Sequence, residues 1–488
     1  MKGHGFSRAL SKIMSLRFPL HDASALGSGI RLQPAAAFTL GRMTLESTEA
    51  QNQGKFVPKG LDISHAWRAM RHRNFRLFFG GQSISLIGTW MTRVATSWLV
   101  YRLTKSPMLL GTVGFAGQIP AFLLAPLAGV VVDRIDRRTL LVWTQSLAMA
   151  QSLLLAWLTL SHRINIPEVL ALSVVQGFVN AFDMPGRQSF MVRMVEDKAD
   201  LSNAIAINSS MVNVARLIGP ALAGMLIAVT NEGWCFLVDG VSYIAVIASL
   251  LMMRIPRAAV AHAATTMLEQ LREGWSYVAG FAPIRTILTL FAILSLMGWP
   301  FMVLMPIFAA QTLHGGPHTL GFLMGAVGVG SLTCALSMVM RKTVRGLTKM
   351  LPIAAAIFGT GLVCFGLSRV LWLSMLMMLV TGFGMMQGMA ASNTILQTIV
   401  EERMRGRVMS YYTMAFVGMA PFGSLLAGTL AHAIGAPHAV IVSGIACILG
   451  ALWFWARLSR IRKQMRPIYE RLGIVPQAAI EIEEGTEG

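Results

Sequence analysis

Ionisable side chains within long apolar stretches are the first candidates for chemistry in this sequence. Arg93, Arg216 and Asp239 each lie inside such a stretch, and so do Asp183 and Arg187, which are four residues apart. A charge in hydrocarbon is costly, and such residues usually face the protein interior or a wet cavity. Either lone arginine would attract an anionic or carbonyl-rich solute; the alternative is that it snorkels or pairs structurally. Asp239 is a candidate proton carrier, or else a hydrated carboxylate near the end of its stretch.

The spacing of Asp183 and Arg187 places both side chains on one face of a helix, where they can pair. A structural ion pair or a gate is the expected role, ahead of a proton site. Uncharged polar residues also stand on apolar stretches and predict a wet cavity between the segments: Gln118, Asn208 and Gln387.

Signatures of enzymatic chemistry are missing from this sequence. It contains no P-loop, no Ser-His-Asp arrangement and no HExxH motif. His314 and His318 flank a Gly-Gly-Pro loop, which disfavours a metal pair, and the four cysteines lie in apolar stretches without CxxC spacing. We therefore expect no enzyme, no cofactor and no metal.

The elements that must position these residues are membrane helices. Of 488 residues, 55% are hydrophobic and 13% charged, with mean hydropathy +0.60, whereas a soluble domain is about one quarter charged. Repeated runs of about 20 apolar residues predict an all-α membrane protein with twelve transmembrane helices. The expected helices span 77–103, 108–132, 138–161, 166–187, 203–229, 234–254, 285–311, 318–340, 349–368, 371–398, 408–431 and 436–457.

An internal repeat divides the twelve segments into two six-helix halves. Leu110-Gly111 recurs as Leu320-Gly321, and the same offset of 210 residues relates Asp183 to Asn393. Two pseudo-symmetric halves are the simplest interpretation. The expected domains are an N-terminal tail (1–66), a first half (67–254), a linker (255–284), a second half (285–457) and a C-terminal tail (458–488).

The N-terminal tail, 1–66, has no sustained apolar period. We expect a disordered cytoplasmic tail, or a natural start nearer Met43 or Met70. Its acid-poor beginning with Arg and Ser fits an organellar transit peptide only weakly.

The connections between the expected helices are alternately rich and poor in lysine and arginine. The poor ones hold only Arg102, Lys105, Arg163 and Arg369. By the positive-inside rule both termini are cytoplasmic, and the net charge of +19 reflects topology rather than nucleic-acid binding. An amphipathic stretch from Met267 to Val278 is expected to lie at the cytoplasmic interface.

The densest cytoplasmic connection runs from Gly129 to Leu141 and reads GVVVDRIDRRTLL. Gly129 and Asp133 lie at the end of one segment. A basic cluster opens the next segment: Arg134, Arg137 and Arg138.

This connection is expected to act as a conformational latch. With the cytoplasmic side closed, Asp133 would lie near the start of segment eleven, around Gly406–Met409. A carboxylate at a helix N-terminus is favoured by about 0.3–1 kcal/mol. Arg134 or Arg137 would pair with Asp133 or with Asp183.

Small residues form a second motif, in segment five. Gly219 and Gly224, following Arg216, make a thin helix face that permits close backbone approach. Pro220 removes a helix hydrogen bond and favours a bend. This combination suits a helix at a moving interface; the alternative is a generic packing face.

The chain from about 67 to 457 resembles the major facilitator superfamily. Gly129–Leu141 is similar to the first loop signature of that superfamily, and Gly219–Gly224 to its fifth-helix signature associated with exporters. Other stretches resemble the branch containing the enterobactin exporter and the macrolide efflux proteins: Gly88-Thr-Trp-Met, Trp98–Tyr101 with Thr104–Pro107, Asp183–Phe190, Asn203–Ser209 and Arg405–Ser410.

The resemblance implies a substrate site between two rocking halves and proton-driven antiport. Three positions depart from the family pattern. Asp136 replaces a usual glycine, although Asp tolerates the left-handed turn that glycine would provide. The stretch Val174–Gly177 lacks the basic residue often linked to proton coupling, and the second-half copy of the loop, Met340–Arg345, lacks the acid.

We therefore expect a secondary active transporter in the cell inner membrane, a monomer whose partners are a small-molecule substrate, protons and the lipid bilayer. The leading hypothesis is a proton-coupled exporter of a small amphipathic molecule, siderophore- or drug-like, working by alternating access. The alternatives are an importer or facilitator on the same fold, and a non-transporting membrane sensor.

Overall fold

Helices are the regular elements throughout the residues that the structure, a computed structural model, describes: 68–195, 197–254, 267–341 and 343–474. The predictions made for residues 1–66, 255–266 and 475–488 concern parts of the chain outside these ranges. The elements in chain order are η1 (Arg68–Arg71), α3 (Arg73–Thr104), α4 (Pro107–Ala116), α5 (Ile119–Arg134), α6 (Arg137–Leu160), α7 (Ile166–Met194), η2 (Lys198–Asp200), α8 (Leu201–Val229), α9 (Glu232–Met252), α10 (Met267–Gly280), α11 (Ala282–Ile293), η3 (Leu294–Gly298), α12 (Phe301–Ile307), η4 (Phe308–Thr312), α13 (Pro317–Val339), α14 (Leu347–Leu367), α15 (Leu371–Ile399), α16 (Glu402–Phe416), α17 (Ala420–Ile434) and α18 (Ala436–Arg471).

Eleven helical segments of the described chain are long and apolar enough to cross a membrane. The predicted fold class, an all-α membrane protein, is confirmed, but the count of twelve is not. The missing segment is α3, whose 32 residues are long enough to span. It falls short in apolarity because it carries polar side chains that include Gln82, Thr92 and Arg93.

Capping side chains mark the helix starts after several short connections. The side chains of Ser106, Asp136 and Asn231 each accept a hydrogen bond from a backbone N–H two or three residues later, and Asn165 forms a capping box with Glu168. The backbone of Asp136 has φ −56°. The left-handed turn considered for this residue is therefore wrong, because Asp136 serves as the N-cap of α6 instead.

Several expected helices are interrupted. Segment two breaks at Gly117–Gln118 and segment eleven at Val417–Met419, in each case shortly before a proline. Segment seven alternates between α-helix and the π-helical turns η3 and η4. By contrast, α8 runs unbroken through Pro220. The last helix, α18, continues well past the expected end at 457, to Arg471.

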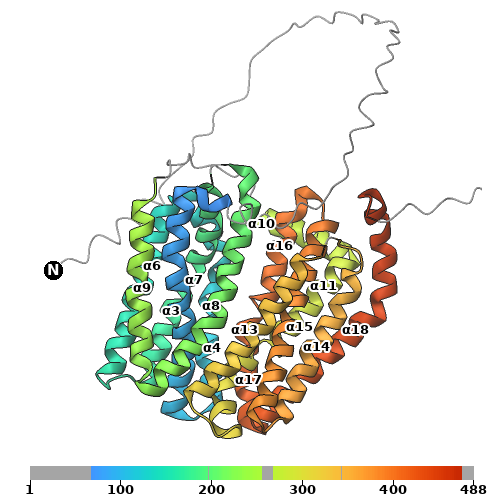
Figure 1. Cartoon of the computed structure of the whole chain (residues 1–488). Coiled ribbons are helices and arrows are strands. Elements are labelled where there is room, and N and C mark those ends of the chain that lie inside the picture. Colours follow the sequence, from blue (N-terminus) through green and yellow to red (C-terminus); the bar gives the residue numbers. More distant parts are fainter. Residues whose placement is uncertain (1–67, 196, 255–266, 342, 475–488) are drawn as a thin grey trace, which may run out of the picture. The chain divides into compact units, whose positions relative to one another are not determined.

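The helices pack in two groups, coloured blue to green and yellow to red in Figure 1. In the first group α3 packs on α8 and α9, α6 packs on α7 and α9, and α5 packs on α7. In the second, α15 packs on α13 and α14, and α14 packs on α18. The groups meet mainly where α8 contacts α13 and α4 contacts α17. The interrupted segments two and eleven therefore pack against each other across this junction.

Candidate functional site

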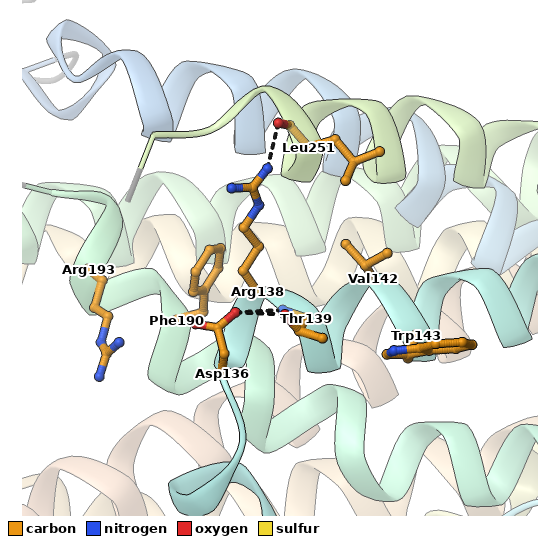
Figure 2. A pocket seen from close by; sticks show the side chains of 8 residues that line it. All are labelled: Asp136, Arg138, Thr139, Val142, Trp143, Phe190, Arg193 and Leu251. Atoms are coloured by element: carbon orange, nitrogen blue, oxygen red, sulfur yellow. Dashed lines mark hydrogen bonds between the residues drawn. The ribbon is translucent and has the colours of Figure 1, made fainter. Parts of the chain in front are cut away.

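The basic connection between α5 and α6 forms a surface pocket of about 290 Å³ with neighbouring helices. Figure 2 shows Arg138 reaching α9, where its Nη2 donates to the Leu251 carbonyl at 2.5 Å. The carboxylate of Asp136 accepts hydrogen bonds from the backbone N–H and the hydroxyl of Thr139, at 3.0 and 2.9 Å. The pocket is lined by Asp136, Arg138, Thr139, Val142, Trp143, Phe190, Arg193 and Leu251.

The proposed latch around Asp133 stays a prediction. Gly129 and Asp133 belong to the last turns of α5, but their side chains lie outside the described part of the structure. Arg134 ends α5 and Arg137 begins α6. A Cβ added at Gly406 of α16 would meet no atom within 4 Å, so nothing described packs against this point of the expected partner helix.

Asp183 and Arg187 form an ion pair on α7, as their spacing predicts. Asp183 is buried, and its Oδ1 accepts hydrogen bonds from Gln145 Nε2 at 2.6 Å and Thr144 Oγ1 at 3.1 Å, both on α6. Three donors thus surround this carboxylate, which holds α6 and α7 together.

The internal repeat relates Asp183 and Arg187 to Asn393 and Gln397, which form an uncharged pair. On α15, Gln397 Nε2 donates to Asn393 Oδ1 at 2.5 Å. The two groups of helices therefore share a pairing at the same helix position, ionic in the first and amide-based in the second.

Trp90 of α3 brings together two arginines that are distant in sequence. The guanidinium carbon of Arg93 lies 4.6 Å from the centroid of the Trp90 ring, and that of Arg216, on α8, lies 5.3 Å from it. Trp90 is buried, whereas Arg93 is exposed and Arg216 is half-buried. Gly219 permits this approach, because a Cβ there would lie 2.5 Å from the Cβ of Trp90.

Asp239 of α9 lies near Arg93 and interacts electrostatically with it. Its Oδ2 accepts hydrogen bonds from Thr92 Oγ1 at 2.8 Å and from Ser152 Oγ at 2.9 Å. Only 2% of Asp239 is exposed, which contradicts the alternative of a hydrated carboxylate. Gly88 makes room for it, since a Cβ there would lie 2.8 Å from Oδ1. We call Trp90, Arg93, Arg216 and Asp239 the Trp90 cluster.

The charge of Arg216 is poorly compensated in the Trp90 cluster. Its Nε and Nη1 atoms are buried and have no hydrogen-bond acceptor among the described residues, and Arg93 repels it. A cation–π contact contributes about 0.5–2 kcal/mol, whereas taking a charge out of water costs several kcal/mol. The cation–π contact with the Trp90 ring therefore offsets only part of the cost of burying the Arg216 charge. Asp239 supplies one negative charge, whereas Arg93 and Arg216 carry two positive charges.

Glycine pairs form the junction between the two groups. A Cβ added at Gly224 of α8 would lie 3.0 Å from the Cα of Gly321 on α13. The same construction places a Cβ at Gly428 of α17 2.8 Å from the Cα of Gly111 on α4. We call these two contacts the glycine seams. Of the thin face expected in segment five, Gly224 thus lies at the interface between the groups, whereas Gly219 packs against α3 within the first group.

The uncharged polar candidates are more scattered. Gln118, at the break before α5, donates from Nε2 to Ser424 Oγ on α17 at 3.3 Å and so adds a polar link across the junction. Asn208 is half-buried on α8, about two turns before Arg216. Gln387 is buried on α15 with its Oε1 unpartnered among described residues. Among the described residues, no hydrogen bond joins Asn208 or Gln387 to the Trp90 cluster.

The sequence patterns did not predict an ion pair that has a buried carboxylate and a half-exposed arginine. Arg102 Nε and Nη2, at the end of α3, donate to the two carboxylate oxygens of Glu232 at 2.8 and 3.0 Å. Glu232 is 1% exposed at the start of α9. A signal existed, because Arg102 stands in a basic-poor connection and Glu232 is an acid at the start of an apolar segment.

The linker helix α10, expected to lie at the membrane interface, also packs against α16 through ion pairs and an aromatic contact. Glu273 forms ion pairs with Arg407 at 2.5 Å and Arg403 at 3.9 Å, both on α16. The ring centroids of Trp275 and Tyr411 lie 5.8 Å apart. The linker is thus attached to the beginning of segment eleven.

Comparison with known proteins identifies the family of this fold. Residues 64–471 match the MFS_3 family, described as transmembrane secretion effector. The staphyloferrin A transporter of Staphylococcus aureus is 24% identical over 393 residues, covering 79% of this chain and 97% of that protein. The multidrug efflux pump Tap of Mycolicibacterium fortuitum is 24% identical over 358 residues, covering 71% and 87%.

Solved structures agree on the fold. A bacterial homologue of the human lysosomal transporter Spinster, in an inward-facing and unoccupied conformation, superposes with TM-score 0.61 at 13% identity, covering 82% of this chain and 98% of that one. The resemblance to the efflux branch is therefore confirmed, and the protein is a multi-pass membrane transporter rather than an enzyme. The chain belongs to the transmembrane secretion effector family of the major facilitator superfamily.

Proposed function

We propose that the protein is a secondary active exporter in the cell inner membrane, with both termini in the cytoplasm. It moves a small amphipathic molecule, siderophore- or drug-like, out of the cell in exchange for protons. Relatives named as a staphyloferrin A transporter and a multidrug efflux pump support a small-molecule substrate of this kind.

The glycine seams are the observation that carries the proposal of alternating access. Gly111 and Gly321 lie one turn into helices that begin at the end of the bundle opposite the α5–α6 connection, and Gly224 and Gly428 lie close to where their helices finish. By the distribution of basic residues this end is the outer one. Close backbone contact here holds the two groups together at the outer side, and small residues let the same surfaces separate.

The proton pathway is proposed to run through Asp239. Its Oδ1 is buried and unpartnered among the described residues, so this carboxyl group can take a proton without breaking its bonds to Thr92 and Ser152. Asp183 suits this role less well, because Arg187, Gln145 and Thr144 already surround it.

Transport in inverted membrane vesicles tests the proposal. Vesicles containing the protein receive a proton gradient, acidic inside, and either ethidium as a drug probe or ferric citrate as an iron chelate. An antibiotic and iron-limitation growth screen of a deletion strain supplies further compounds. Gradient-dependent accumulation of a probe or screened compound supports export. Accumulation in right-side-out vesicles instead shows an importer. Failure of every compound in both vesicle types and in proteoliposomes refutes transport and favours a sensor.

A further inference from the structure

The two arginines of the Trp90 cluster occupy an unusual place for positive charge. Trp90 and Arg93 belong to α3 and Arg216 to α8, within the first group of helices. The backbone of Arg216 also borders the second group, because a Cβ added at Gly328 of α13 would lie 3.3 Å from the Arg216 carbonyl oxygen. The cluster therefore sits beside the junction between the groups.

Other internal charges of the described chain are matched by an opposite charge. Asp183 pairs with Arg187 near one end of the bundle, and Glu232 pairs with Arg102 near the other. In the Trp90 cluster, Asp239 faces Arg93, and the described residues provide no carboxylate as an ion-pair partner for Arg216. The cluster thus keeps one positive charge in excess.

Two N–H donors of Arg216 lack a hydrogen-bond acceptor among the described residues. Arg216 Nε and Nη1 are shielded from solvent and make no hydrogen bond with described residues. The Nε–H and Nη1–H groups point to different edges of the guanidinium, so each can donate a separate hydrogen bond to a carboxylate or phosphate oxygen. Arg93, beside it, is not covered by other described residues. Both guanidinium groups lie over the Trp90 ring, which restrains their positions by cation–π contact.

We propose that Arg93 and Arg216, held on the Trp90 ring, bind an oxyanion group, carboxylate or phosphate, of the transported molecule. The inference rests on the proposed transport function and narrows its substrate class to solutes with at least one such anionic group. Asp239 is then the internal competitor of that group for Arg93.

Binding of small anions to the purified full-length protein in detergent tests the proposal without requiring transport. The probes are citrate and inorganic phosphate, with triethyl citrate as the uncharged analogue and tetraphenylphosphonium as a cation, measured by isothermal titration. Citrate, phosphate or both should bind at least tenfold more tightly than triethyl citrate. Arg216→Gln and Arg93→Gln should each weaken anion binding at least tenfold, whereas Arg216→Lys, which keeps the charge but loses the planar group over Trp90, should weaken it less.

Arg457→Gln is the matched control, because Arg457 stacks on Trp453 at 4.3 Å but lies on α18, away from the cluster. It should bind the anions as wild type does. Equal binding of citrate and triethyl citrate, or unchanged anion affinity in a folded Arg216→Gln variant, overturns the proposal. If Arg216→Gln does not fold, unchanged affinity in Arg93→Gln overturns it equally.

The binding assay also separates this inference from the proposed function. Anion binding that depends on Arg216, together with absent transport in vesicles, leaves the site standing and refutes the exporter. Transport of ethidium that survives Arg216→Gln, without anion binding in wild type, leaves the exporter standing and refutes the site.

Discussion

Alanine in place of Gly224 should shift the protein away from the state described here. The added Cβ would lie 2.6 Å from the Pro317 carbonyl oxygen and 3.0 Å from the Gly321 Cα, whereas ordinary contacts begin at 3.4 Å. Both partners are backbone atoms, so α8 and α13 themselves must move apart by several tenths of an ångström. Overpacking of this kind costs about 1–3 kcal/mol, which corresponds to a population change of about 5- to 150-fold.

The strain should favour the alternative state rather than unfold the protein, because the contact joins two groups of helices and each group keeps its own packing. Spin labels at Thr230→Cys and His318→Cys, both exposed at this end of α8 and α13, report the separation by pulsed electron paramagnetic resonance. The four native cysteines are first replaced by serine or alanine. Gly224→Ala should increase the population at long distance and lower thermal stability little.

Gly80→Ala is the matched control, since a Cβ at Gly80 of α3 would meet no atom within 4 Å. Its distance distribution should equal that of wild type. If Gly224→Ala also keeps the wild-type distribution, the glycine seam does not set the balance between the states, and the reasoning above is refuted.

Three further substitutions test other parts of the structure. Asp133→Asn should leave the protein folded but raise cytoplasmic cysteine labelling, since it removes the proposed latch; unchanged labelling would sink that idea. Asp239→Asn should make transport in inverted vesicles indifferent to the imposed pH gradient while exchange of substrate continues, and a preserved gradient response would exclude Asp239 as the proton carrier. Glu232→Gln should lower stability by about 1–3 kcal/mol, less than for a fully buried ion pair because Arg102 is half-exposed; thermal unfolding measures this, and an unchanged melting temperature would contradict it.

Local sequence patterns predicted most of the helices. Apolar runs of membrane length located eleven of the twelve expected spans, and the i,i+4 spacing of Asp183 and Arg187 predicted their ion pair. The same reasoning missed the interruptions at Gly117–Gln118 and Val417–Met419. Hydropathy averages over a whole segment, whereas a break depends on one turn of backbone and on the helix packed beside it.

The Trp90 cluster shows why the candidate site was harder to predict. Arg93, Arg216 and Asp239 were each recognisable as charges in apolar stretches, but their convergence depends on how α3, α8 and α9 pack. The roles of Gly88 and Gly219 were hidden for the same reason, since each makes room for a side chain on another helix. Spacing along the chain reports which residues share a face, not which faces meet.

The unequal pairing at the repeat-related positions has an electrical consequence. The ion pair Asp183–Arg187 has an amide pair, Asn393–Gln397, as its counterpart, and charges deep within the spans, Arg93, Arg216 and Asp239 among them, belong to the first group. A membrane potential acts on charge, at about 2.3 kcal/mol per elementary charge per 100 mV across the full membrane. Voltage therefore acts mainly on one group of helices, while the other responds to it through the contacts at the junction, which include the glycine seams and the Gln118–Ser424 hydrogen bond.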